Sequence, residues 1–384
     1  MVMEEYEKNI LDRAAESLID FFARLYDRIR PGWYRKNVSK VNEWKLMAYA
    51  LNRSPPGVIG LALVVAFILL GIFGPLTTPF KYNYFPVYEA PKSRLAPPWT
   101  TVTSKSGKSL FFPLGTDHFG RDLLSLLLQG ARTSLVISFV TIFLGVPLGI
   151  ILGLVAGYYG GKVDELIMRV TDVFLAFPAL ILAIAFAAVL PERIDAVIAS
   201  NPWLKDFLLW LFALDRRDAG LLSRPLAVIL AMVIVWWPGY ARIIRGSTLT
   251  ERENLYVEAA RAVGLGNWTI MVRHILPNIL GPVLVYITLD FGSVVLMEAG
   301  LSFLGLGPVP PIADWGRIVY DGSQYFPRAW WLILIPGLVV IFSALGWNLL
   351  GDTLRDVLDP KTRRGIEFRL KRKKKEEAEE VKSS

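Results

Sequence analysis

The sequence predicts an all-α integral membrane protein with six transmembrane helices. The 384-residue chain is 53% hydrophobic and only 20% charged, and its apolar residues come in long blocks instead of being spaced to leave polar faces. A helix needs about 20 predominantly apolar residues to cross a bilayer. Because backbone polar groups in lipid must be satisfied within the segment, blocks of this length form helices. A membrane β-barrel would show short alternating segments, which the sequence lacks.

Six blocks are long and apolar enough to span the membrane. The first follows Pro55-Pro56-Gly57, which suits a helix start, and the fifth contains the only charged residue within a block, Asp290. The blocks are 58–74, 133–161, 173–190, 225–241, 275–297 and 329–351. The stretch 207–214 is apolar but too short to span, so we expect a helix that lies at the membrane interface.

Basic residues set the predicted orientation. Lysine and arginine are dense in the tail from 361 to 375 and in the loop 242–273, so both are expected in the cytoplasm by the positive-inside rule. Six spans then place the N-terminus in the cytoplasm as well. The first outside loop departs from the rule because it carries several cations: Lys81, Lys92, Arg94, Lys105 and Lys108. We expect a multi-pass protein of the cell membrane with both termini inside.

These features divide the chain into five segments. They are a cytoplasmic N-terminal segment 1–54, a first span 55–75, an extracellular loop 76–130, a transmembrane core 131–360 with spans two to six, and a charged cytoplasmic tail 361–384. Apolar residues of the first segment recur at helical spacing and predict an amphipathic helix: Ile10, Ala14, Leu18, Phe21, Leu25 and Ile29. We expect this helix to pack on the protein or on the membrane surface, with a regulatory role as the alternative.

Composition excludes several classes of chemistry. The chain has no cysteine, and its two histidines, His118 and His274, have no metal-ligand spacing, so no metal site is predicted. No nucleophile motif is present either, so no catalytic residue is expected. The net charge of +8 is ascribed to cytoplasmic loops and not to nucleic-acid binding.

The most informative segment is the loop 251–280. Its first helix is expected to end near Gly264, which suits a helix C-cap, and a second helix leads to Pro277 at the start of the fifth span. Four residues of the first helix are predicted to share a face, and Glu258 lies at its rim: Tyr256, Ala259, Ala260 and Val263. This pattern is typical of a short helix that enters a groove of another protein. The alternative is an ordinary loop that packs on its own subunit.

The same residues carry a resemblance to a known family. Glu258-Ala259-Ala260, Gly264 and Leu276-Pro277 are similar to the EAA loop of importers of the ATP-binding cassette (ABC) class, although His274 stands where the general pattern has isoleucine. The likeness continues through 114–122, 130–132, 157–161, Phe177-Pro178, 237–242, 301–307 and 348–360. In this order, the motifs resemble the C-type permease subunit of the dipeptide/oligopeptide ABC importer family over roughly 110–360.

The resemblance implies a fold, a function and partners. The fold is the six-helix bundle of type I ABC importer permeases, with the helix–turn–helix as a cytoplasmic coupling element in which 253–264 is the coupling helix. The implied partners are a second related permease, two ATPase subunits and an extracellular or periplasmic solute-binding protein. The implied solute is a dipeptide or oligopeptide, with an oligosaccharide or nickel as alternatives. The ATPase-coupling residues would be Tyr256, Glu258, Ala259, Ala260, Val263, Gly264, Leu276 and Pro277.

The chain itself is not expected to hydrolyse ATP. A phosphate-binding loop needs glycine, four residues, then Gly-Lys-Ser/Thr, whereas Gly107-Lys108-Ser109 has Val102 in place of the first glycine. We therefore expect no cofactor in this chain, with ATP and magnesium bound by the partner ATPases. A secondary carrier would typically show an internal repeat with broken helices, and a membrane enzyme would show a nucleophile motif or metal cluster. Neither signature is present in the sequence.

Polar residues near the spans have two interpretations. Asp290 and Glu298 are eight positions apart, so both can face a solute pathway, and the alternative is an interhelical hydrogen bond that orients the bundle. Arg169 and Asp172 are expected to neutralise each other. Polar residues before the second span are expected to cap the outside loop against the bundle, with solute contact as the alternative: Asp117, Arg121 and Asp122.

Overall fold

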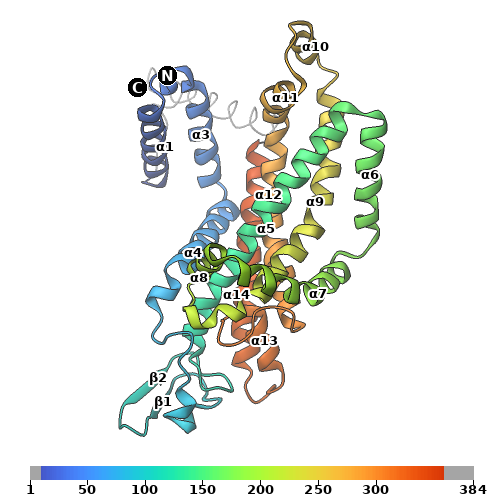
Figure 1. The fold of residues 1–384 in the computed structure, drawn as a ribbon. Coiled ribbons are helices and arrows are strands. Elements are labelled where there is room, and N and C mark those ends of the chain that lie inside the picture. The colour runs from blue at the N-terminus through green and yellow to red at the C-terminus, as the bar shows by residue number, and fades with distance from the viewer. Residues whose placement is uncertain (1–9, 359–384) are drawn as a thin grey trace, which may run out of the picture. The chain divides into compact units, whose positions relative to one another are not determined.

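The computed structural model describes residues 10–358, which are mostly helical (Figure 1). This part of the chain forms two compact units. The smaller unit combines residues up to 62 with those from 346 onward, and the larger unit comprises residues 63–345. The predicted charged tail lies outside the described residues.

The smaller unit contains a helical hairpin. Helices α1 (Ile10–Ile29) and α3 (Val38–Asn52) pack against each other and are joined by the short α2 (Trp33–Lys36). Lys45 donates a 2.8 Å hydrogen bond to Asp20, and Asn52 donates one of 3.0 Å to Asp12. These side-chain contacts fix the two helices along their length.

Five helices of the described chain are long and apolar enough to cross a membrane. They are α4 (Pro55–Thr77), α5 (Leu123–Tyr159), α9 (Ser223–Glu251), the helical run Asn267–Phe303 and α14 (Trp331–Leu358). The helical run consists of α11 (Asn267–Thr269), the π-helical turn η4 (Ile270–Ile275) and α12 (Leu276–Phe303). A bent pair, α6 (Gly161–Ala176) and α7 (Ala179–Ser200), brings the number of candidate spans to six. The predicted fold class is confirmed.

The third span, predicted over 173–190, corresponds to this bent pair and not to a single helix. The axes of α6 and α7 differ by 90°, and the break falls at Phe177-Pro178. Proline disfavours helical geometry in the residue before it, and Phe177 accordingly adopts an extended conformation with φ −90° and ψ 141°. The unbroken apolar run concealed this break.

The larger unit is built on close contact between α5 and α9. Glycines recur every fourth residue on one face of α5, at Gly149, Gly153 and Gly157. A Cβ atom at Gly153 would lie 2.6 Å from the carbonyl oxygen of Ala241, and one at Gly157 would lie 2.6 Å from the Cβ atom of Thr248. Small residues at this spacing let two membrane helices approach with their backbones almost in contact.

A small folded segment, which we call the hairpin module, occupies residues 78–122 between α4 and α5. It contains the 3₁₀ turns η1 (Pro86–Tyr88) and η2 (Pro91–Ser93) and the strands β1 (Thr100–Thr103) and β2 (Ser109–Phe112), which pair antiparallel. Its core consists of Ala90, Ala96, Val102, Leu110 and Phe112, with Phe80 packed against it. The all-helical expectation missed this module because its strands are only four residues long.

The remaining helices are short. They are α8 (Pro202–Phe212), the 3₁₀ helix η3 (Arg216–Leu221), α10 (Leu255–Ala262) and α13 (Trp315–Ser323). Helix α8 covers most of the apolar stretch 207–214 and begins earlier than expected, at Pro202, where proline suits the first turn.

The glycine contact predicts a position-specific loss of stability. We expect Gly153→Ala to destabilise the purified protein by about 1–3 kcal/mol, because the added methyl group would push α5 away from α9. Thermal unfolding in detergent measures this change. The matched control is Gly246→Ala on α9, where a Cβ atom would meet nothing within 4 Å. Equal unfolding temperatures for the two variants would contradict the proposed packing.

Candidate functional site

The loop between α9 and α12 forms a helix–turn–helix around α10. Helix α10 ends in a Schellman cap, in which Leu265 N donates to Ala260 O at 3.1 Å and Gly264 N donates to Arg261 O at 2.9 Å. Gly264 has φ +82°, the left-handed conformation that this cap requires and that glycine adopts without strain. The predicted stop at Gly264 is therefore a defined structural turn.

The exposed face of α10 is offset from the predicted one. Val257 is fully buried and Ala260 is 7% exposed, so these two residues face their own chain, where α10 packs against η4. Ala259 and Glu258 are exposed, and Val263 is 81% exposed. The prediction placed Ala260 on the open face, whereas the structure uses it to seat the helix.

The other predicted coupling residues differ in their surroundings. Leu255, which the sequence analysis did not single out, is 82% exposed at the start of α10. Tyr256 is half-buried, and its hydroxyl donates a 2.9 Å hydrogen bond to Glu251 at the end of α9. Leu276 is half-buried and Pro277 is exposed in the first turn of α12. The open face of α10 thus consists of Leu255, Glu258, Ala259, Ala262 and Val263.

The C-terminal end of α5 supports the loop. The Tyr158 hydroxyl donates a 3.0 Å hydrogen bond to Asn267, and the Arg261 guanidinium lies 5.2 Å from the centre of the Tyr158 ring. Arg252 donates a 2.9 Å hydrogen bond to the carbonyl oxygen of Gly157. These contacts hold both sides of α10 to one spanning helix. The motif 157–161 was the only sequence signal of this support, and its role was not predicted.

Two ion pairs join α6 to α9 next to this end of α5. Arg245 binds Asp164 through two hydrogen bonds of 2.7 and 2.5 Å, and Arg242 pairs with Asp172. The pairing expected between Arg169 and Asp172 is wrong, because Arg169 pairs with Glu165 at 2.6 Å. The spacing of four residues between Glu165 and Arg169 suits an ion pair along a helix.

The two acidic residues assigned to a solute pathway are both engaged within the chain. Trp236 of α9 donates a 3.1 Å hydrogen bond to Asp290, which is half-buried. Glu298 is fully buried and accepts hydrogen bonds of 3.2 Å from Ser134 and from Ser302. The contacts of Glu298 agree with the alternative of a hydrogen bond between helices. Asp290 is the better placed of the two to meet a solute.

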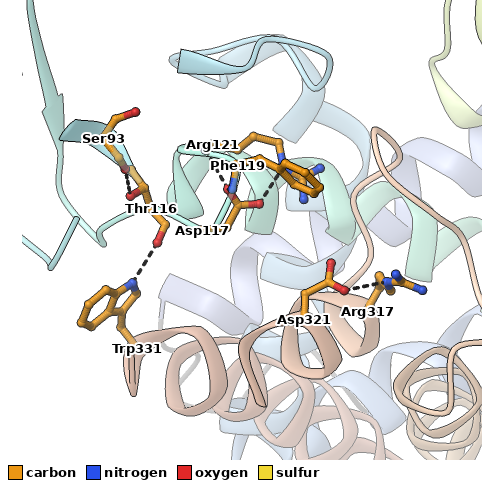
Figure 2. A network of polar contacts seen from close by, with 8 residues as sticks. All are labelled: Ser93, Thr116, Asp117, Phe119, Arg121, Arg317, Asp321 and Trp331. Carbon is orange, nitrogen blue, oxygen red and sulfur yellow. Dashed lines mark hydrogen bonds and ion pairs between the residues drawn. The ribbon is translucent and has the colours of Figure 1, made fainter. Parts of the chain in front are cut away.

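At the other end of α5, the segment 114–122 forms a polar network, shown in Figure 2. The Asp117 carboxylate accepts a 2.7 Å hydrogen bond from Arg121 Nε and further hydrogen bonds from the backbone N–H groups of Phe119 and Arg121. Asp122 caps α5 by accepting a 2.8 Å hydrogen bond from Ser125 N. Asp122 thus caps a bundle helix as expected, whereas Asp117 and Arg121 bind each other within the segment.

Further contacts tie this network to neighbouring elements. The Thr116 hydroxyl donates to the carbonyl oxygen of Ser93, and the Thr116 carbonyl accepts a 3.1 Å hydrogen bond from Trp331 Nε1 (Figure 2). On α13, Arg317 pairs with Asp321 at 3.0 Å. Burial raises the pKa of Asp321, and the nearby Arg317 opposes this shift. The hairpin module is therefore fixed firmly to the start of α5.

Two segments of the chain match known protein families. Residues 145–364 match the family described as binding-protein-dependent transport system inner membrane component. Residues 42–98 match the N-terminal transmembrane domain of oligopeptide transport permease C. The first match covers more than half of the chain and includes both α10 and the α5–α9 contact.

Individual relatives align over most of their length. The dipeptide transport system permease protein DppC of Alkalihalophilus pseudofirmus is 36% identical over 84% of this chain and 91% of that protein. The di/tripeptide transport system permease protein DppC of Pseudomonas aeruginosa is 38% identical over 77% of this chain and 86% of that protein. The dipeptide transport system permease protein DppC of Escherichia coli K12 is 37% identical over 81% of this chain and 90% of that protein.

The support of the loop by Tyr158 can be tested directly. We expect Tyr158→Phe to accelerate amide hydrogen exchange in residues 255–269 by about fivefold, because it removes one partly buried hydrogen bond worth about 1 kcal/mol. Mass spectrometry of the exchanged protein measures this rate. Tyr159→Phe is the matched control, since that neighbouring ring is 51% exposed. Unchanged exchange in the Tyr158 variant would show that the hydrogen bond does not restrain the loop.

Proposed function

Because the chain belongs to the family of binding-protein-dependent transport system inner membrane components, we propose that it is the C-type permease subunit of an ATP-driven ABC importer for dipeptides or oligopeptides. The peptide assignment is supported by the names of relatives at 36–38% identity, each of which is a dipeptide or di/tripeptide permease. Oligosaccharide or nickel import, weighed from the sequence, finds no support among these relatives. A secondary carrier is disfavoured by membership of this family.

The proposal depends on the exposed face of α10. Its open face combines apolar side chains, Leu255 and Val263, with the small Ala259 and the carboxylate of Glu258. A short helix with this surface fits a groove on another protein, with the carboxylate available to a basic residue at the groove's rim. We infer that the groove belongs to an ATPase subunit, which binds ATP and magnesium and supplies the energy for import.

The remaining partners follow from this assignment. One chain carries one α10, so two ATPase subunits require a second, related permease to supply the other coupling helix. A solute-binding protein delivers the peptide from outside. Asp290 is the residue we assign to the solute pathway, where its carboxylate suits the amino group of a peptide.

The orientation proposed for the chain follows from α5. The hairpin module is fixed to the N-terminal end of this helix and α10 to its C-terminal end. Helix α5 has 37 residues and is about 55 Å long, which exceeds the thickness of a bilayer. The two ends of α5 therefore lie on opposite sides of the membrane. The segment 242–273, which contains α10, carries five arginines, in agreement with a cytoplasmic location: Arg242, Arg245, Arg252, Arg261 and Arg273. The module is then outside and both termini are inside.

The coupling role predicts a loss of ATP hydrolysis without a loss of folding. We expect Glu258→Arg combined with Val263→Arg to lower hydrolysis by the reconstituted importer at least about tenfold, because two cations would have to enter the groove. Hydrolysis is measured in lipid vesicles that contain both permeases and both ATPases. Ala260 is avoided because it is buried against its own chain.

Glu192→Arg is the control for this measurement, since it reverses an exposed charge on α7, outside the loop. The variant permease must also be purified with its partner permease, which shows that it folds. If hydrolysis and ATPase assembly both match the wild type, α10 is not the docking helix.

The solute class can be tested in the same vesicles. Candidate solute-binding proteins, each loaded with a dipeptide, an oligopeptide, an oligosaccharide or nickel, are added to the outside of the wild-type importer. We expect a peptide-loaded protein to stimulate ATP hydrolysis and the accumulation of labelled peptide in the lumen. Stimulation by the sugar-loaded or nickel-loaded protein alone would refute the peptide assignment.

A further inference from the structure

The hairpin module carries an excess of exposed cations. Lys92, Arg94, Lys105 and Lys108 are all exposed, and none forms an ion pair with another residue between 10 and 358. The module contains three carboxylates, and Asp117 and Asp122 are buried in the network at the start of α5. The third, Glu89, accepts a 2.9 Å hydrogen bond from the Tyr84 hydroxyl.

The positive charge of the hairpin module is unusual for a segment on the outside of the membrane. Lysine and arginine are normally concentrated in cytoplasmic loops, whereas the proposed orientation places the module outside. Membrane insertion therefore gives no reason for these cations, and the polar network at the start of α5 uses none of the four.

Two of the cations line a groove along β1. The groove has a volume of about 610 Å³ and is lined by Lys92, Lys105, the residues of β1 and one carboxylate, Glu89. Lys105 and Lys108 belong to the turn that joins β1 to β2, where Ser104 N donates to Lys108 O at 2.8 Å. Lys92, Lys105 and Lys108 thus outnumber the single carboxylate, Glu89, so the groove and the turn together carry a net positive charge.

Large aromatic side chains are exposed on the same module. Trp99 is 79% exposed and Tyr88 is 77% exposed, and the Trp99 ring lies 5.9 Å from the ring of Phe111, which is 47% exposed. The backbone of Trp99 has φ +60°, a left-handed conformation that is unfavourable for a bulky residue. The chain thus holds Trp99 in a strained conformation, although the exposed ring contributes little to the module's own core.

We propose that these residues form a docking surface for an acidic patch on the solute-binding protein. We call this surface the basic hairpin face and define it as Tyr88, Lys92, Trp99, Lys105, Lys108 and Phe111. Exposed aromatic residues provide the buried anchors of protein interfaces, and surrounding cations steer an acidic partner and set its orientation. The inference rests on the proposed function, which supplies a solute-binding protein on this side of the membrane.

The position of the hairpin favours a protein partner over anionic lipid. In Figure 1, β1 and β2 lie beyond the ends of α4 and α5, at the far end of the larger unit from α10. Lipid headgroups surround the ends of spanning helices, whereas a soluble protein approaches along the bundle axis. The groove beside β1 is long enough to contact all four residues of the strand, which suits an extended acidic segment.

The test uses the complete importer in lipid nanodiscs and the solute-binding protein that stimulates its ATP hydrolysis. We expect Lys105→Gln combined with Lys108→Gln to weaken binding about three- to tenfold and to flatten the decrease of the association rate with salt. We expect Trp99→Ala to weaken binding at least about tenfold. The matched control is Lys81→Gln combined with Arg94→Gln, which removes two charges from the same module outside the basic hairpin face, and it should stay within about twofold of the wild type.

Each outcome decides the proposal. An equal loss in the control and the lysine pair would mean that only net charge matters, and the face would be refuted. Binding that depends on phosphatidylglycerol in the nanodisc, and not on these residues, would identify lipid as the partner and overturn the proposal. If no loaded binding protein stimulates the wild-type importer, the proposed function itself fails, so the two failures are distinguishable.

A second measurement covers the case in which Trp99→Ala does not fold. The chain has no cysteine, so Lys108→Cys provides a unique position for a photo-crosslinker. We expect this position to crosslink to the solute-binding protein and Lys162→Cys, at the exposed start of α6, not to do so. Absence of a crosslink at position 108 in an importer that still responds to the binding protein would refute the docking surface.

Discussion

The contact between the glycine row of α5 and the face of α9 is the constraint on which the larger unit depends. Lipid is as apolar as the side chains of a membrane helix, so helices there gain stability from close packing and not from leaving water. Gly149, Gly153 and Gly157 bring the two backbones together over more than two helical turns. Side chains at either end of α5 can then act at fixed distances from each other.

Both ends of α5 are used in this way. At its start, Asp122 caps the helix and the adjoining network joins the hairpin module to α5 and to Trp331. At its end, Tyr158 and the carbonyl oxygen of Gly157 hold the loop that carries α10. One rigid helix thus connects the part of the chain that we assign to the outside with the part that we assign to ATPase docking.

The long apolar blocks of the sequence made most of the fold predictable. The features that were missed, a helix break and two short strands, depend on local backbone geometry. Apolar blocks of 17 or more residues identify spanning helices because the bilayer demands about that length. The same criterion is blind to Pro178, which breaks a helix without lowering its hydropathy. It is also blind to the strands of the hairpin module, which are only four residues long each.

In the candidate site, too, the sequence pattern predicted the ends of helices but not which helix face is exposed. Gly264 and Pro277 marked the turn and the start of the fifth span because each has a backbone preference that does not depend on neighbours. Which face of α10 is open could not be read from periodicity, since Ala260 and Ala259 are equally small. The choice depends on packing against η4, which buries Val257 and Ala260 together.

The connection from α10 into the bundle constrains how the protein can move. Helix α10 is joined to α9 by the short turn 252–254, and to α12 by the turn at Gly264 followed by α11 and η4. Asp290 lies 14 residues into α12, about 21 Å from the loop, where it accepts a hydrogen bond from Trp236 of α9. We therefore propose that a displacement of α10 moves α9 and α12 together, because the hydrogen bond between Trp236 and Asp290 joins these two helices. Rigid-body movement of this group of helices would then change access to Asp290, as alternating access requires.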